Sequence, residues 1–325
     1  MIRSGAVALA VVLALGLASC GNEEAELAEK AKQEQEQAEL DKGVAAMNAG
    51  DFNAAITVFR PLAEAGNTAA QNNLGWLYFN GKGVPENDAE ATKLFQQAAE
   101  KGKAAAQFNL ASAYEYGNGV PQDIEQALRW YRASAQQGWP EAEVNLGRMY
   151  DEGLGVGQNP LAALRLFHAA AAHGQPQAMF NLGSMYGSGR GVPKNDAEAL
   201  KWYRMAADKG FAEAQYMLGN FYEDGAGVMQ DYAEAMRWYR LAAAQGHPGA
   251  QNNIGRFYAD GLGVPKDNVK TLMWFTLALP GLRGEEAANA QTFRDEFASG
   301  MTRQQIAQAD ELAMRCRDSG FMTCD

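Results

Sequence analysis

Asparagine side chains recur at one position of a regular pattern and could do the chemistry of a binding site. They stand 36 residues apart, with Met217 at the one interruption. The set is Asn73, Asn109, Asn145, Asn181 and Asn253. A carboxamide offers both a donor and an acceptor, so each could bond the backbone of an extended peptide. The same amides could instead bond neighbouring helices and brace the molecule, and both interpretations are open.

Residues beside these asparagines vary from one interval to the next, which is how a regular scaffold could specify one partner. We expect them to point into the same groove as the asparagines, with the aromatic ones exposed as anchors for a protein partner. The predicted partner-binding residues are Trp76, Phe108, Arg148, Phe180, Tyr216 and Arg256. Tyrosines that repeat two residues after Trp76 and its equivalents are predicted to pack in the core instead.

The residues of this sequence give little support for a catalytic site. The three histidines are His168, His173 and His247, and no set of Ser, His and Asp stands out as a triad. His168 and His173 are five residues apart, so they do not share a helix face well, and no third metal ligand recurs nearby. Gly-x-Gly elements such as Gly189-Arg190-Gly191 follow predicted helices and not strands. We predict no enzyme, no metal and no cofactor.

The helices that position these residues are predicted from six sequence segments that align without gaps. Their anchor alanines are 36 residues apart, from Ala70 to Ala250. In each unit the apolar residues fall at helical spacing twice. Glycines inside the first helix, such as Gly75, indicate close helix contact. That helix should end near Gly81, and the second should begin near Asn87 with an Asn or Asp cap. Stacking of such hairpins makes a solenoid.

The combined pattern resembles a known repeat. Ala-x-x-Asn-Leu-Gly-x-x-Tyr-x-x-Gly-x-Gly-Val, followed by Ala-x-x-Trp-Tyr-x-x-Ala-Ala-x-x-Gly, is similar to the Sel1-like repeat, a relative of the tetratricopeptide repeat. The resemblance covers residues 67–282 as six repeats, with local departures such as Ala111 for glycine. It implies an all-α, right-handed α-solenoid that acts as an adaptor for protein partners. Cysteine-rich relatives described as β-lactamase-like carry cysteine pairs through their repeats, and this chain does not.

The first residues resemble a lipoprotein signal. Arg3 precedes a run of 13 apolar or glycine residues, too short for a good membrane span. Leu17-Ala18-Ser19-Cys20 resembles the bacterial lipobox, which implies a signal peptide at 1–19 and lipidation of Cys20. An ordinary secretory signal is the alternative. Gly21, where an aspartate would favour inner-membrane retention, implies an outer-membrane anchor facing the periplasm of the bacterial envelope.

The remaining segments complete the predicted organisation. Residues 20–40 form a polar tether, 41–66 a tetratricopeptide-like hairpin, and 283–325 a cap with helices near 285–298 and 302–317. If Cys20 is lipidated, Cys316 and Cys324 remain as a natural disulfide pair in an oxidising compartment. A metal site with two thiolates is the alternative, but it lacks further ligands.

The net charge and its distribution limit the classes of possible binding partner. A formal charge of −11 argues against nucleic acid, because phosphate binding needs a basic surface. Lys93, Arg129, Arg165, Lys201 and Arg237 form a periodic basic stripe, either paired with nearby carboxylates or able to contact anionic lipid. We predict a monomeric, membrane-tethered scaffold that binds a protein or peptide in its concave groove. The alternatives are a periplasmic protein that binds or hydrolyses cell-wall fragments or β-lactams, and a surface factor that contacts a host.

Overall fold

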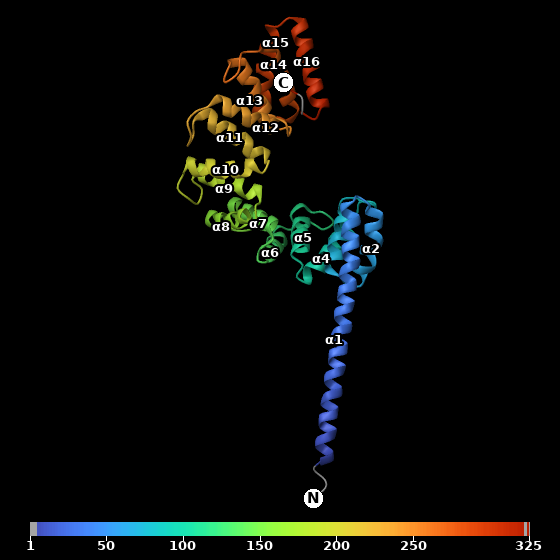
Figure 1. Ribbon diagram of the computed structural model, residues 1–325. Helices are drawn as coiled ribbons and strands as arrows, with labels where there is room; N and C mark the ends of the chain where they lie inside the picture. The colour runs from blue at the N-terminus through green and yellow to red at the C-terminus, as the bar shows by residue number, and fades with distance from the viewer. Residues whose placement is uncertain (1–4, 322–323, 325) are drawn as a thin grey trace. The chain divides into compact units, whose positions relative to one another are not determined.

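The chain is helical throughout the part that the structure describes. A computed structural model describes residues 5–321 and 324, with side chains from residue 26 onward. Within those residues there are sixteen α-helices, one 3₁₀-helix and no strand (Figure 1). Adjacent helices pack as antiparallel pairs in two compact units, Met1–Gln137 and Gly138–Asp325. Among the described helices, none combines the length and apolar character needed to cross a bilayer.

One long helix precedes the repeats. Helix α1 (Gly5–Asn48) runs through the segments predicted as signal, tether and first helix of the N-terminal hairpin. Cys20 falls within α1, but its side chain lies outside the described part, so its lipidation stays a prediction. The chain turns at Ala49–Asp51, and the Asp51 side chain caps α2 (Phe52–Glu64) by accepting from the backbone of Ala54.

The repeats are regular helix pairs. In the first unit they are α3 (Thr68–Phe79), α4 (Asp88–Glu100), α5 (Ala104–Tyr116) and α6 (Ile124–Ala135). The second unit continues with α7 (Pro140–Glu152), α8 (Pro160–Ala172), α9 (Pro176–Ser188), α10 (Asp196–Asp208), α11 (Ala212–Asp224), α12 (Tyr232–Ala243), α13 (Pro248–Asp260) and α14 (Asn268–Ala278). The predicted all-α stack of helix pairs is therefore confirmed within each unit.

Capping residues set the helix bounds. Each second helix of a repeat begins after an Asn or Asp whose side chain accepts a backbone N–H of the first turn, as Asn87 does from Glu90 at 3.0 Å. Most first helices end at a glycine in the left-handed region, for example Gly153 with φ of 76°. A side chain there would strain the backbone, so the glycine fixes the start of the loop.

The glycine inside the first helix marks a close approach, as predicted. A Cβ added at Gly147 on α7 would lie 2.6 Å from Cε1 of Phe167 on α8, closer than real side chains approach. Phe167 is fully buried, so its ring occupies the space that a methyl group would need. The aromatic centre of the second helix thus packs directly on the backbone of the first helix.

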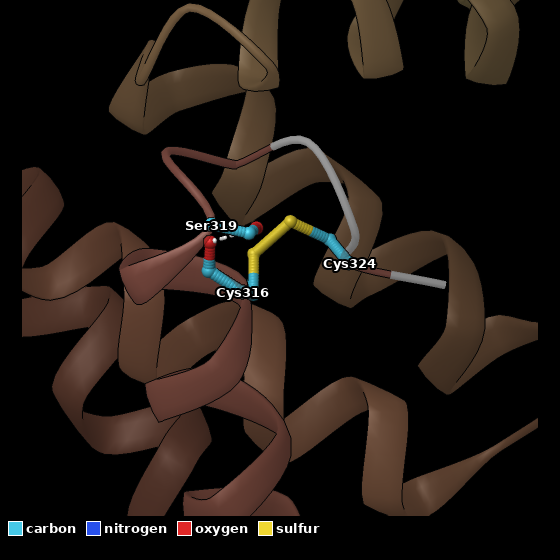
Figure 2. Close-up of a disulfide and its surroundings, with 3 residues drawn as sticks. All are labelled: Cys316, Ser319 and Cys324. Atoms are coloured by element: carbon cyan, nitrogen blue, oxygen red, sulfur yellow. Dashed lines mark hydrogen bonds between the residues drawn. A yellow bond between two sulfur atoms is a disulfide. The ribbon is translucent and has the colours of Figure 1, made fainter.

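Two helices cover the end of the second unit. The 3₁₀-turn η1 (Leu279–Gly281) leads into α15 (Gly284–Ser299) and α16 (Arg303–Asp318), close to the predicted bounds. Thr302 caps α16 in a reciprocal capping box with Gln305. Buried Ala309 and Ala313 of α16 pack on the apolar side chains of α14. The predicted disulfide is present: it joins Cys316 to Cys324 with the two Cα atoms 4.6 Å apart (Figure 2).

Candidate functional site

The predicted partner-binding residues all lie on the first helices of the repeats. Those on α3 and α5 belong to the first unit, and those on α7, α9, α11 and α13 to the second. Every one of them is half-buried. The expectation that Trp76, Phe108, Phe180 and Tyr216 are exposed is wrong, because each ring packs against its neighbours. Phe180, for example, lies 5.5 Å from the rings of both Tyr203 and Phe211.

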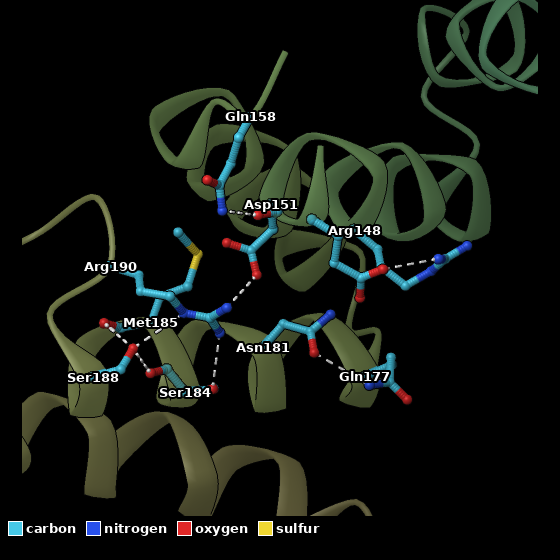
Figure 3. A network of polar contacts seen from close by, with 10 residues as sticks. Arg148, Asp151, Gln158, Gln177, Asn181, Ser184, Met185, Ser188 and Arg190 are labelled. Atoms are coloured by element: carbon cyan, nitrogen blue, oxygen red, sulfur yellow. Dashed lines mark hydrogen bonds and ion pairs between the residues drawn. The ribbon is translucent and has the colours of Figure 1, made fainter. Parts of the chain in front are cut away.

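One group of predicted residues comes together around a hollow between α7 and α9. The hollow, here the Asp151 pocket, has a volume of about 440 Å³. Asn145, Arg148 and Asn181 line it, together with Asp151 and Arg190, which the sequence did not single out. Figure 3 shows Arg148, Asp151, Asn181 and Arg190. A cavity of this size is within the range of ligand sites and can accept one or two side chains of a partner.

An ion pair forms one wall of the Asp151 pocket. Asp151 Oδ2 lies 2.8 Å from Nη1 of Arg190, and the same guanidinium donates to the hydroxyls of Ser188 and Ser184 at 3.2 Å each. The Asp151 side chain is only 11% exposed, and its Oδ1 has no hydrogen-bond partner among the described residues. A buried carboxylate oxygen without a donor costs free energy. This oxygen has less than 1 Å² of accessible surface, so an incoming N–H or O–H reaches it only after the side chains around it move apart.

The neighbouring polar groups are already ordered. Arg148 pairs with Glu152 at 3.3 Å on the same helix, and Gln177 donates to Asn181 at 3.3 Å. Beneath the pocket, burial raises the pKa of Tyr203 to about 12, opposed by its hydrogen bond with Ser184 and the charge of Arg190. The phenol therefore stays neutral, and the charge of the site comes from the two arginines and two carboxylates.

A second polar cluster joins α11, α12 and α13. Glu223 lies 2.5 Å from Nη2 of Arg256 and accepts from the hydroxyl of Tyr239 at 2.7 Å. Asn253 donates to Asn220 at 3.2 Å. Burial raises the pKa of Tyr239, and the bond to the Glu223 carboxylate raises it further. These contacts join successive repeats, so Asn253 and Arg256 brace the array.

The first unit shows the same bracing. Asn109 Nδ2 donates to Asn72 Oδ1 at 2.9 Å across two successive first helices. The ring of Phe108 lies 5.9 Å from Tyr131, whose hydroxyl bonds the buried carboxylate of Glu115 at 2.8 Å. The Asn109–Asn72 bond joins two repeats, which is the second of the two interpretations that the sequence left open, whereas the contacts of Phe108 and Tyr131 lie within one repeat. Their role in partner binding stays a prediction.

Buried glutamines at the start of the first helices were missed. Gln107 donates to the carbonyl of Ala99 at 3.2 Å and accepts from Gln137 at 2.7 Å. Gln215 makes the equivalent contacts with Ala207 at 3.2 Å and Gln245 at 2.8 Å. Each satisfies a carbonyl at the end of the preceding helix, where backbone acceptors lack intrahelical donors. The recurrence of glutamine one residue after the anchor alanine was the signal that could have revealed them.

Three of the five residues of the basic stripe on the second helices pair with carboxylates one turn earlier. Lys93 lies 3.3 Å from Glu90, Lys201 3.2 Å from Glu198, and Arg237 2.9 Å from Glu234. Exposed pairs of this kind contribute little free energy but neutralise the face locally. The interpretation as a paired outer face is therefore favoured over contact with anionic lipid. No cluster of three metal-binding side chains occurs among the described residues.

Comparison with known proteins identifies the repeat. The model of the Sel1 repeat matches residues 68–103, 104–139, 140–175, 176–211, 212–247 and 248–279. The chain belongs to the Sel1 repeat family. Repeats of this family generally mediate protein–protein interaction, and the fold is a scaffold of a non-catalytic kind.

Two solved structures show the same Sel1-type architecture. A Sel1 repeat protein from Oxalobacter formigenes is 34% identical, covers 76% of this chain and 98% of its own, and superposes with a TM-score of 0.70. The c5321 protein of uropathogenic Escherichia coli, a protective antigen with an SLR fold, is 28% identical, covers 90% of this chain and 71% of its own, and has a TM-score of 0.55. A search of curated proteins finds no match.

Proposed function

We propose that this Sel1 repeat protein is a lipid-anchored scaffold of the bacterial envelope that binds a protein or peptide at the Asp151 pocket. The observation that carries the proposal is the partnerless Oδ1 of buried Asp151 in a pocket that also holds Asn145, Arg148 and Asn181. Amide and guanidinium donors beside a buried acceptor match the alternating donors and acceptors of a polypeptide backbone. The lipobox-like sequence at Cys20 supports the anchor.

The groups around the pocket favour a polypeptide over a highly charged ligand. Both arginines are paired with carboxylates of the chain itself, at 3.3 Å for Arg148 and 2.8 Å for Arg190. A strongly anionic or cationic ligand would have to break one of these pairs and leave a charge without its partner. A neutral backbone amide carries no charge that competes with either pair.

A photocrosslinker placed at Gln177 tests the binding site. Gln177 lines the pocket and is exposed, so its replacement by a benzoylphenylalanine residue leaves the core intact. The matched control carries the same probe at Lys201, an exposed residue of a second helix. We expect one stoichiometric protein crosslink at residue 177 in intact envelopes, lost when Asp151→Asn or Asn181→Ala is added. Equal crosslinking at residue 201, or capture of a glycan fragment only, refutes the proposed site.

The anchor needs a separate test. Metabolic labelling with an alkyne fatty acid should label the wild-type chain and leave Cys20→Ser unlabelled and released from the membrane fraction. Cys316→Ser is the matched control, since it removes a cysteine from the far end of the chain and should be labelled normally. Labelling of Cys20→Ser at the wild-type level would rule out the lipid anchor while leaving the pocket proposal standing.

A further inference from the structure

A hollow in the first unit lies where other repeats hold a tryptophan of their own. The hollow, here the Leu94 pocket, has a volume of about 610 Å³ and is formed by α2, α3 and α4. Its lining includes Arg60, Gln71, Leu74, Tyr78, Lys93 and Leu94. It shares no residue with the Asp151 pocket.

The sequence period explains why this space is open. Four repeats carry tryptophan at the position of Leu94, namely Trp130, Trp202, Trp238 and Trp274. The first and third repeats have leucine there, Leu94 and Leu166, which lacks the indole ring. Leu94 itself is buried, at 7% exposure, so it lies at the floor of the hollow and does not fill it. Leucine in place of tryptophan therefore leaves the volume of the indole ring unfilled, while the residues around that volume remain.

Part of this lining matches the surroundings of Trp238 in the fifth repeat, although Gln97 and Glu100 replace Leu241 and Ala244. There the indole lies 4.3 Å from the guanidinium carbon of Arg237 and 6.0 Å from that of Arg204. Trp238 packs in one cluster with Ala207 and Leu218. Four periods earlier, Arg204 and Arg237 correspond to Arg60 and Lys93.

Further equivalents confirm the correspondence. Ala207 and Leu218 correspond to Ala63 and Leu74, and both of these line the Leu94 pocket. Arg204 bonds the hydroxyl of Tyr222, and Arg60 bonds that of Tyr78 at 3.5 Å. Beside Trp202 of the fourth repeat, His168 of the third repeat takes the place of Arg60, and its ring lies 5.3 Å from that of Trp202. The first repeat therefore retains the two cations and the apolar residues that surround the indole elsewhere, but not the indole itself. Three carboxylates, Glu64, Glu90 and Glu100, also line the pocket.

A buried acceptor without a partner also lines the Leu94 pocket. Gln71 is only 4% exposed, and its Oε1 has no hydrogen-bond partner among the described residues. In the second and fifth repeats the equivalent glutamine accepts from Gln137 or Gln245, whereas Lys101 occupies that position here and donates to the carbonyl of Gly66 at 2.9 Å. An indole would restore the packing that four other repeats have at this position. Its N–H would be left without a hydrogen-bond partner in the described part of the chain, as Nε1 of Trp238 is in the fifth repeat.

We propose that the Leu94 pocket binds the indole side chain of a tryptophan exposed on a partner polypeptide. The bound ring takes the place that Trp238 takes in the fifth repeat, between the cations of Arg60 and Lys93 and over Leu74. Cation–π attraction favours an aromatic ring over an aliphatic side chain of similar area. The first unit therefore contributes an anchor point of its own, distinct from the Asp151 pocket.

Fluorine NMR with the full chain tests this assignment. The probe is N-acetyl-5-fluorotryptophan amide, which we expect to bind with a dissociation constant on the order of 1 mM, as is usual for a fragment of this size. Unlabelled N-acetyltryptophan amide should displace it, and N-acetylleucine amide should not. Absence of a shift or broadening at several-fold higher concentration, or equal displacement by the leucine amide, overturns the proposal.

A variant that fills the pocket provides the decisive comparison. Leu94→Trp supplies the ring that four other repeats carry, so it should fold normally and lower probe affinity at least about tenfold. Leu161→Trp adds the same residue at an exposed position of α8 and should leave the affinity unchanged. Arg60→Gln retains the cavity but removes one cation, and should weaken binding about two- to fivefold. Undiminished binding to Leu94→Trp, with Arg60→Gln also at wild-type affinity, excludes the Leu94 pocket.

Discussion

Two glycines on one helix should respond to the same substitution with opposite signs. Gly183 and Gly187 both lie in α9. A Cβ at Gly183 would lie 2.7 Å from Cδ1 and 2.8 Å from Cε1 of Tyr203, whereas a Cβ at Gly187 would lie 3.6 Å from the Cβ of Ala199, an ordinary contact. Alanine is favoured over glycine inside a helix by up to about 1 kcal/mol. That gain is common to both sites, so the contacts decide the difference.

The ring of Tyr203 cannot move aside to relieve the contact at Gly183. It is 3% exposed and lies between Phe180 at 5.5 Å and Phe221 at 5.4 Å. Overpacking of a well-filled core costs about 1–3 kcal/mol. After the gain in helix propensity, Gly183→Ala should destabilise the second unit by up to about 2 kcal/mol, which corresponds to a fall of up to about 8 °C in Tm for a domain of this size. Gly187→Ala should stabilise by up to about 1 kcal/mol.

Urea titration followed by far-UV circular dichroism measures the difference between the two variants. Because repeats of a solenoid contact only their neighbours, hydrogen exchange should place the loss for Gly183→Ala in α9 and α10 and leave the first unit unchanged. If Gly183→Ala is as stable as Gly187→Ala, the close packing of first helix on aromatic ring does not limit the stability of the repeat.

Two further predictions concern the second unit. Removal of the disulfide by Cys324→Ser should lower the free energy of local unfolding of α16 by about 2–3 kcal/mol, the amount expected for a short loop. Hydrogen exchange of α16, compared between variant and wild type, measures this difference. Equal protection in the two proteins would contradict the prediction. Burial lowers the pKa of His247, opposed by the charge of Glu213, and its Nδ1 accepts from the backbone of Ala250 at 3.1 Å to cap α13. The unfolded chain therefore takes up the proton first, so this contribution to stability is fully present above about pH 6.5 and is lost as the pH falls toward the lowered pKa of the folded state. His247→Asn retains a capping acceptor that does not titrate. The free energy of unfolding of this variant should therefore fall less than that of the wild type between pH 7 and pH 5. If the urea midpoints of the two proteins run parallel across that range, His247 does not titrate as inferred.

Features set within one repeat were predictable from the sequence. Asn87 caps the helix that it was expected to cap, because capping depends on residues three positions apart. Gly147 was expected at a close helix contact, and the ring of Phe167 lies there. The pairing of Cys316 with Cys324 followed from counting cysteines in an oxidising compartment.

Contacts between successive repeats could not be predicted in the same way. The period indicates that Asn109 and Asn253 share one position, but their partners, Asn72 and Asn220, occupy different positions of the preceding repeat. Which side chains meet depends on the small rotation between neighbouring hairpins, and the period does not specify it. The environment of the Asp151 carboxylate could not be predicted for the same reason, since it includes Arg190 from the loop of the next repeat.

The cover over the last repeat has a consequence for assembly. Leu272 and Leu277 of α14 are buried against α16, whose end is held by the link from Cys316 to Cys324. A helix pair without such a cover offers the same kind of face that one repeat offers to the next, and a second molecule could add to it head to tail. By holding α16 over α14, the disulfide favours assemblies with a fixed number of molecules over open-ended filaments. Reducing conditions would therefore weaken the barrier to polymerisation before they unfold the repeats.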